Sequence, residues 1–135
     1  MLEYGGLFLA AFLAATILPL ASELPLALLV RSSGAVVWPV VVATAGNYLG
    51  ACTTYALACV AAKRLLESGR RPSPRALAAM QRYGAPALLL SWVPVIGDGI
   101  VVAAGASGIR FLPFSAWTVA GKAARYAFVA WAALR

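Results

Sequence analysis

Apolar residues fill most of the chain in long runs, and polar residues interrupt those runs at a few places. The longest uninterrupted run covers residues 36–62. As a helix it would measure about 40 Å at ~1.5 Å per residue, which exceeds the ~30 Å hydrocarbon core of a bilayer. A second run of this kind covers residues 111–134. The pattern therefore predicts two membrane-spanning helices.

Two further apolar segments, residues 7–31 and 85–107, are each broken near the middle. Proline removes a helical hydrogen bond, and glycine loosens a helix. In the first segment the break residues are Pro19 and Pro25, which lie around Glu23. In the second segment they are Pro94, Gly97 and Gly99, which lie around Asp98. Each half is shorter than the ~20 residues that a spanning helix needs. Each segment is therefore predicted to form a re-entrant hairpin, and one kinked spanning helix is the alternative that the pattern leaves open.

The two halves of the chain repeat at an interval of 75 positions. This shift maps Pro19 onto Pro94, Glu23 onto Asp98, Gly46 onto Gly121 and Asn47 onto Lys122. The pattern predicts an internal duplication, with repeat one at 7–62 and repeat two at 85–134, although chance matching in an Ala/Val/Leu-rich chain is the alternative. Paired broken segments in two halves of a chain are the sequence feature that points to a transporter site.

Composition places the whole chain in a membrane. Of its 135 residues, 63% are hydrophobic and 11% are charged, and the mean hydropathy is +0.88. A chain of this length cannot bury so much apolar surface in water. We therefore expect an all-α integral membrane protein with one domain over residues 1–135.

The net charge of +7 is concentrated in the connection 63–84. Its charged residues are Lys63, Arg64, Glu67, Arg70, Arg71, Arg75 and Arg82. Such a segment is typical of a cytoplasmic loop that contacts anionic headgroups, and no base-reading or stacking groups accompany it, so we expect no nucleic acid partner. A short interfacial helix is predicted between Pro74 and Tyr83.

This topology gives the two repeats opposite orientations. With the connection inside, the first hairpin opens outward and the second opens inward, which returns Arg110 to the cytoplasmic side. A plain four-span arrangement would leave Arg110 outside. The predicted architecture is therefore two inverted repeats, each a re-entrant hairpin followed by a spanning helix.

Four ionisable residues are predicted at membrane depth: Glu23, Asp98, Lys122 and Arg125. Each unpaired charge there costs at least about 2.5 kcal/mol. One interpretation is a buried ion-pair cluster that only locks the fold, but buried pairs stabilise poorly compared with apolar packing, which favours a functional role.

The types of these residues suggest that role. Lys122 and Arg125 can hold an anionic group, the Asn47 amide lies at a similar depth, and arginine suits phosphate. Glu23 and Asp98 can exchange protons. These features suit an amphiphile whose phosphate crosses the membrane while its tails stay in lipid.

Other functions find little support in the residue types. The chain has no histidine, which removes the commonest metal ligand and acid–base group. Cys52 and Cys59 are about 10 Å apart if both lie on one helix, which is too far for a disulfide. We therefore expect no metal, no cofactor and no enzyme activity.

Several ordered motifs resemble the short YqaA-like branch of the DedA superfamily, also described as SNARE-associated or VTT-domain membrane proteins. They are Ser22-Glu23, Gly46-Asn47-Tyr48-Leu49-Gly50, Arg82-Tyr83-Gly84, Trp92-Val93-Pro94-Val95-Ile96-Gly97-Asp98 and Gly121-Lys122-Ala123-Ala124-Arg125-Tyr126. The resemblance implies a bacterial inner-membrane protein with two inverted re-entrant hairpins. It also implies lipid movement, because relatives are implicated in flipping undecaprenyl phosphate or phospholipids with ion gradients, and eukaryotic relatives scramble lipids.

One departure from the family pattern matters for the site. Longer DedA proteins carry two arginines around the proline of the second hairpin, and those positions here are Ser91 and Gly97. The phosphate-binding role would therefore move to Lys122 and Arg125.

The resulting hypothesis is a small flippase for an anionic lipid, such as a polyprenyl phosphate or a phospholipid, coupled to protons through Glu23 and Asp98. An H⁺ or Na⁺ carrier, and a structural or assembly protein, are the alternatives. Four short elements enclose little volume, which is compatible with a homodimer.

Overall fold

The computed structural model describes residues 1–16, 22–69, 74–93 and 96–135, without the side chains of 75–77 and 79. The elements in these ranges are helical: α1 (Leu2–Thr16), α2 (Glu23–Ser33), α3 (Val37–Glu67), α4 (Pro74–Tyr83), the 3₁₀ helix η1 (Ala85–Trp92), α5 (Ile96–Ala106) and α6 (Phe111–Ala133). The predicted all-α class is confirmed for this part of the chain.

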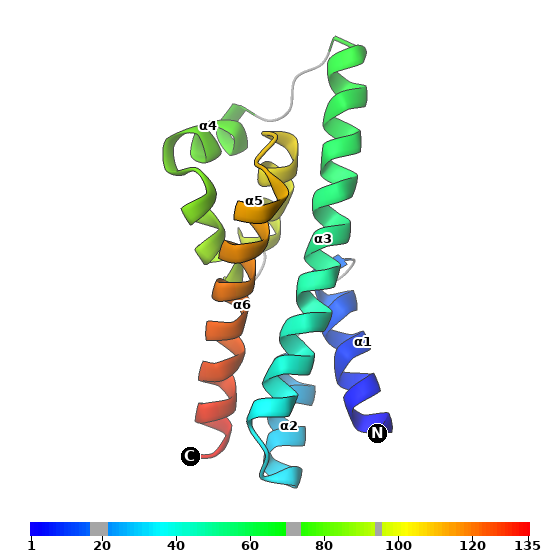
Figure 1. Cartoon of the computed structure of the whole chain (residues 1–135), viewed down its shortest axis with the longest axis vertical. Helices are drawn as coiled ribbons and strands as arrows, with labels where there is room; N and C mark the ends of the chain where they lie inside the picture. Colours follow the sequence, from blue (N-terminus) through cyan, green and yellow to red (C-terminus); the bar gives the residue numbers. More distant parts are fainter. Residues whose placement is uncertain (17–21, 70–73, 94–95) are drawn as a thin grey trace.

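α3 runs the height of the molecule, the shorter α6 lies along its middle and lower parts, and the remaining elements pack beside these two helices (Figure 1). α1 and α2 lie beside the lower half of α3, whereas η1 and α5 lie beside its upper half, under α4. α1 packs along α3 and η1 along α6, while α2 packs on α6 and α5 on α3. Each long helix is thus flanked by one element from each broken segment.

Helix length distinguishes the two long helices, α3 and α6, from the shorter elements. α3 has 31 residues and is, among the described helices, the one long and apolar enough to cross a membrane by length and composition. α6 has 23 residues, or about 35 Å, but the polar groups within it, including Lys122 and Arg125, lower its apolar content. α1 and α5 are apolar but shorter, with 15 and 11 residues.

The apolar core is divided into two clusters, and each of them includes residues of α3 and α6. One cluster joins α1, α2, α3 and α6, and its members include Leu7, Leu26, Val30 and Tyr126. The other joins α3, α4, η1, α5 and α6, and its members include Met80, Leu88, Val101 and Phe114. Each broken segment therefore has its own core, and both cores share α3 and α6.

Close helix approach depends on glycines, as the Gly46-xxx-Gly50 spacing predicts. A Cβ at Gly46 would lie 2.4 Å from the backbone oxygen of Phe8, and a Cβ at Gly50 would lie 2.5 Å from that of Phe12. On the other long helix, a Cβ at Gly121 would lie 2.7 Å from the Leu89 oxygen. α1 and η1 thus reach the backbones of α3 and α6 only because these positions lack a side chain.

Gly46→Ala is expected to destabilise the protein, because the added methyl group would push α1 away from α3. Overpacking of this kind costs about 1–3 kcal/mol. Gly6→Ala is the matched control, since nothing lies within 4 Å of that Cβ and alanine is the better helix former by ~1 kcal/mol. Unfolding in detergent should show the first variant less stable than wild type and the second at least as stable. Equal stability of the two variants would contradict the packing described here.

Three local features differ from the sequence-based expectations. α1 starts at Leu2 rather than at residue 7, and α3 continues to Glu67, so that Lys63 and Arg64 are helical. The first arm of the second segment is a 3₁₀ helix of 8 residues, although such runs rarely exceed 3–4 residues. Cys52 and Cys59 both lie on α3 as free thiols, as the spacing predicts.

Candidate functional site

An ion pair joins the start of α2 to the lower part of α6. Arg125 donates from its guanidinium to the Glu23 carboxylate. Glu23 is the first residue of α2, so the carboxylate lies where the second half of the first broken segment begins. The side chains of Arg125 and Glu23 keep 17% and 32% of their surface exposed, which means that the pair can be reached from outside the core.

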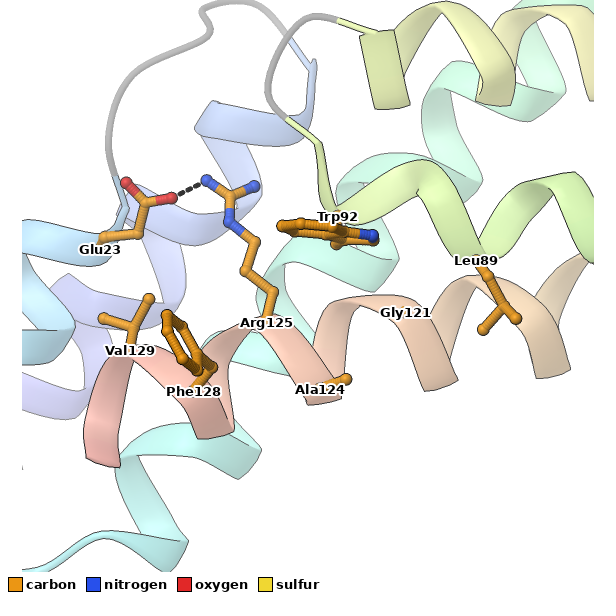
Figure 2. Close-up of a pocket in the computed structure, with 8 residues that line it drawn as sticks. All are labelled: Glu23, Leu89, Trp92, Gly121, Ala124, Arg125, Phe128 and Val129. Carbon is orange, nitrogen blue, oxygen red and sulfur yellow. Dashed lines mark hydrogen bonds and ion pairs between the residues drawn. The ribbon is translucent and has the colours of Figure 1, made fainter. Parts of the chain in front are cut away.

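This ion pair lies at the edge of a cavity of about 590 Å³ (Figure 2). The cavity lies among the start of α2, the second half of η1 and α6. Its lining residues are Glu23, Leu89, Trp92, Gly121, Ala124, Arg125, Phe128 and Val129. The other six are uncharged and almost wholly apolar. The cavity therefore has one ion pair at one end and apolar side chains elsewhere.

A buried hydrogen bond fixes the position of Glu23. The hydroxyls of Ser22 and Tyr126 share a bond of 2.7 Å, with Ser22 3% exposed and Tyr126 fully buried. Since Ser22 immediately precedes Glu23 and Tyr126 immediately follows Arg125, this bond holds the two halves of the ion pair at the same level. Tyr126 thus helps to position the ion pair from the side of the protein core.

Lys122 lies inside the protein rather than at the cavity. It is 3% exposed and donates to the Asn47 side-chain oxygen. The Asn47 amide nitrogen in turn donates to the Ala11 backbone oxygen at 3.0 Å. This chain of bonds ties α6 to α3 and α3 to α1. Two residues predicted to bind substrate, Asn47 and Lys122, therefore contact each other, and the third, Arg125, lines the cavity.

Asp98 lies in the first turn of α5 and is partly buried. It interacts electrostatically with Lys122, but no ion pair involving Asp98 is found among the described residues. The predicted cluster of four charges is therefore divided into a direct Glu23–Arg125 pair at the cavity and a looser Asp98–Lys122 relation within the core.

The predicted break residues have different surroundings. Pro19 and Pro94 lie outside the described residues. Pro25, Gly97 and Gly99 are helical, in the first turns of α2 and α5. Their interpretation as break residues stays a prediction, and the structure places all three where a helix begins, at positions that tolerate proline and glycine.

Gly97 also has a packing role. A Cβ at this position would lie 2.4 Å from the Ser91 oxygen, whereas Gly99 has nothing within 4 Å. The end of η1 therefore approaches the start of α5 closely at Gly97.

Comparison with known proteins identifies the family. The inner membrane protein YqaA of Escherichia coli (strain K12) is 39% identical over 126 residues, with 93% of this chain and 87% of the relative covered. The protein of the same name from Shigella flexneri matches equally well. An uncharacterized protein from Haemophilus influenzae is 37% identical over 128 residues, with 89% of this chain and 80% of the relative covered. The chain belongs to the YqaA-like branch of the DedA family.

This DedA chain is accordingly a bacterial inner-membrane protein, as predicted. No protein-family model matches it, and no solved structure matches it either.

The departure from the longer DedA proteins has a structural counterpart. Ser91 is 3% exposed, and the backbone of η1 leaves no room for a side chain at Gly97. Neither position can present an arginine without a local rearrangement. Arg125 is the basic residue that lines the cavity of this DedA chain.

Sequence reasoning missed several residues of the site. Trp92 lines the cavity next to the Arg125 side chain (Figure 2), and Tyr126 holds Ser22. Both lie within the motifs that carry the family resemblance, so the motifs contained the signal. Three buried hydroxyls without a described partner were also missed: Thr44, Ser91 and Thr118.

Tyr126→Phe is expected to destabilise the protein by about 1–2 kcal/mol, because the buried Ser22 hydroxyl loses its partner. Denaturant unfolding in detergent measures this change. Tyr83→Phe is the matched control, since Tyr83 is 62% exposed. Equal effects of the two substitutions would show that the Ser22–Tyr126 bond does not hold the ion pair in place.

Proposed function

We propose that this protein is a small DedA-type flippase that moves an anionic, phosphate-bearing lipid across the inner membrane with proton coupling through Glu23 and Asp98. The observation that carries the proposal is the Glu23–Arg125 pair at one end of an otherwise apolar cavity. A cavity of this kind matches a lipid, which has one charged end and apolar tails.

Arg125 is the anion-binding group in this proposal. Its planar guanidinium presents paired donors that fit phosphate geometry. It is held on α6, a long helix, and the neighbouring Tyr126 is fixed by its bond to Ser22. Leu89, Trp92 and Phe128 supply the apolar wall against which a tail can lie. A head and a tail can thus be bound together in one place.

Glu23 competes with the substrate for Arg125. While Glu23 is ionised, it occupies the guanidinium, and the site carries no net charge. Protonation of Glu23 releases Arg125, which then binds the phosphate of the lipid. Binding of one anion is thereby linked to uptake of one proton, and Asp98 at the tip of the other segment supplies the second proton-accepting group.

The packing of the helices supports an inverted-repeat arrangement. An inverted repeat would make α1 equivalent to η1, α2 to α5, and α3 to α6. This equivalence maps the pair α1–α3 onto η1–α6 and the pair α2–α6 onto α5–α3. The two elements of each of these pairs are in contact. Asn47 and Lys122, which are 75 positions apart, contact each other, as equivalent residues do at a pseudo-two-fold axis. Paired broken segments around such an axis give alternate access from the two sides.

The half-height elements support re-entrant hairpins. α1 and α2, with 15 and 11 residues, are too short for the hydrocarbon core at about 1.5 Å per residue. We place the connection 63–84 in the cytoplasm, at the end of the molecule that carries α4, with both termini at the opposite end (Figure 1). The exposed Lys63 and Arg64 then face anionic headgroups.

Equilibrium binding tests the proposal. Purified protein is titrated with a polyprenyl phosphate, a phosphatidylglycerol and the uncharged polyprenol, and Trp92 fluorescence is followed in a variant whose other three tryptophans are phenylalanine. We expect saturable binding of a phosphate-bearing lipid, tighter at lower pH, and at least about tenfold weaker binding of the alcohol because the charge-assisted bonds to Arg125 are lost. Equal affinity for the alcohol would contradict an anion site.

A further inference from the structure

Two buried threonines on the long helices differ from the other threonines of the chain. Thr44 on α3 and Thr118 on α6 are 9% and 0% exposed, and neither hydroxyl has a partner among the described residues. The hydroxyls of Thr16, Thr53 and Thr54 all donate to backbone oxygens. A buried hydroxyl without a partner is costly in a low-dielectric interior. Bound water is a partner that both hydroxyls could take.

Both threonines lie on the seam between α3 and α6, on either side of the Asn47–Lys122 contact. Thr44 precedes Asn47 by three residues, and Thr118 precedes Lys122 by four. The two helices run in opposite directions (Figure 1), so Thr44 lies toward the termini and Thr118 toward α4. The offsets correspond to about 4.5 and 6 Å along the helices. Polar groups thus extend along the seam for about 10 Å around its middle.

The seam continues toward α4 through a further pair of hydroxyls. Tyr48 on α3 donates to Ser115 on α6 at 2.6 Å, and Ser115 lies three residues before Thr118. Toward the first broken segment, the seam reaches the Ser22–Tyr126 bond. Oxygen and nitrogen atoms are therefore present at intervals from the upper part of α6 to the residue that precedes Glu23.

This seam is distinct from the lipid cavity. At 100° per residue, Ser115, Thr118, Lys122 and Tyr126 share one face of α6, whereas four of the five α6 residues that line the cavity, Gly121, Ala124, Arg125 and Phe128, lie on an adjacent face. Lys122 does not line the cavity. The two faces approach each other at Arg125 and Tyr126, next to the Glu23 carboxylate, and at Val129, one turn further along α6.

We propose that the α3–α6 seam is a hydrated proton path, with Lys122 as its central proton-carrying group, separate from the lipid cavity. Water molecules bound by the Thr44 and Thr118 hydroxyls connect those polar groups of the seam that do not contact each other directly. The Lys122 ammonium releases a proton to one side, becomes an amine, and takes a proton from the other side, so that one proton moves and the site returns to its starting state. Ionisable groups inside membranes mark such pathways.

The groups around Lys122 fit this role. Asp98 on α5 and Cys52 on α3 are the titratable groups that act on it electrostatically, and Arg125 and Tyr126 are its neighbours on α6. The α2 residue Glu23 is paired with Arg125, and η1 has no ionisable side chain. In the proposed path, Asp98 receives the proton on one side of Lys122, and the Tyr126–Ser22 pair leads on the other side toward Glu23, the residue after Ser22.

This inference rests on the proposed proton coupling, and proton flux tests it independently of the lipid. Proteoliposomes with a trapped pH-sensitive dye are given a potassium gradient and valinomycin, and proton uptake is measured for wild type, Lys122→Gln and the double variant Thr44→Val/Thr118→Val. Valine keeps the shape of threonine and removes the hydroxyl. We expect Lys122→Gln to abolish the flux and the double variant to lower it about tenfold, the effect of losing roughly one hydrogen-bonded relay.

Three controls distinguish the path from a packing effect. Thr53→Val alters an exposed threonine on α3 and should keep wild-type flux. Thr44→Ser/Thr118→Ser keeps both hydroxyls and should retain most of the flux. The thermal midpoint of the double valine variant should stay close to that of wild type, because valine keeps the shape of threonine and neither hydroxyl has a described protein partner to lose.

The outcomes separate this inference from the proposed function, because lipid movement is measured in the same vesicles. Normal proton flux in the double valine variant or in Lys122→Gln overturns the path, and so does a wild type without voltage-driven flux. Loss of flux in the serine variant as well assigns the effect to packing and also overturns it. Flux that depends on the seam in vesicles without lipid movement supports the path and contradicts the flippase.

Discussion

Arg125→Gln is expected to reduce lipid translocation about a hundredfold. Among the described residues, Arg125 is the one cation that lines the cavity, so the substitution takes away the charged partner of the phosphate. Hydrogen bonds to charged groups are worth about 1.5–3 kcal/mol, and 2.7 kcal/mol corresponds to a factor of about 100. Arg125→Lys keeps the charge without the planar fork and should retain an intermediate rate. Flippase activity in proteoliposomes is the measurement.

Two controls make this result specific to Arg125. Arg31→Gln removes an exposed arginine at the end of α2 and should leave translocation unchanged. Arg125→Gln also leaves the Glu23 carboxylate without its partner, so the double variant Arg125→Gln/Glu23→Gln is made in parallel. If the double variant is as stable as wild type and still inactive, the loss belongs to anion binding. Wild-type translocation in that variant would contradict a role for Arg125.

Glu23→Gln is expected to separate binding from proton coupling. Glutamine cannot carry the charge that occupies Arg125, so the anion no longer competes with a carboxylate. Affinity for a phosphate-bearing lipid at neutral pH should rise roughly tenfold or more, which corresponds to the loss of one charge-assisted competitor. Binding should lose its pH dependence, and a pH gradient should no longer drive lipid accumulation. Lipid exchange without a gradient should persist.

Glu3→Gln is the control for this substitution, because Glu3 is exposed in the first turn of α1. It should keep wild-type affinity and wild-type pH dependence. Weaker lipid binding in Glu23→Gln would contradict the competition, since Glu23 would then assist the anion instead of excluding it. Full gradient-driven transport by Glu23→Gln would place proton coupling elsewhere.

The sequence predicted most of the secondary structure because apolar runs and helix-breaking residues are local signals. The predicted helix between Pro74 and Tyr83 is α4, and the run 111–134 is α6 to within one residue. The Gly46-xxx-Gly50 spacing permits close helix approach, and α1 lies against α3 at both glycines. The 3₁₀ geometry of η1 was not foreseen, because the hydrophobic pattern does not distinguish such a short helix from an α-helix.

The sequence did not indicate which distant side chains pair with each other. Glu23 and Arg125 are 102 positions apart, and Ser22 and Tyr126 are 104 apart. The sequence predicted which charged residues lie at membrane depth, but composition does not say which acid meets which base. Tertiary packing makes that choice, by bringing α2 against α6. The same packing buries Lys122 against Asn47, so that one of the two predicted basic residues faces the cavity and the other lies behind it.

Lipid translocation by the purified protein in proteoliposomes tests the central claim most directly. A fluorescent phospholipid and a polyprenyl phosphate are followed with and without a pH gradient, for wild type, Asp98→Asn and Lys122→Gln. We predict that wild type moves a phosphate-bearing lipid faster with the gradient, and that neither variant responds to the gradient. Movement of neither lipid by folded wild-type protein would contradict the flippase and favour ion transport or a structural role.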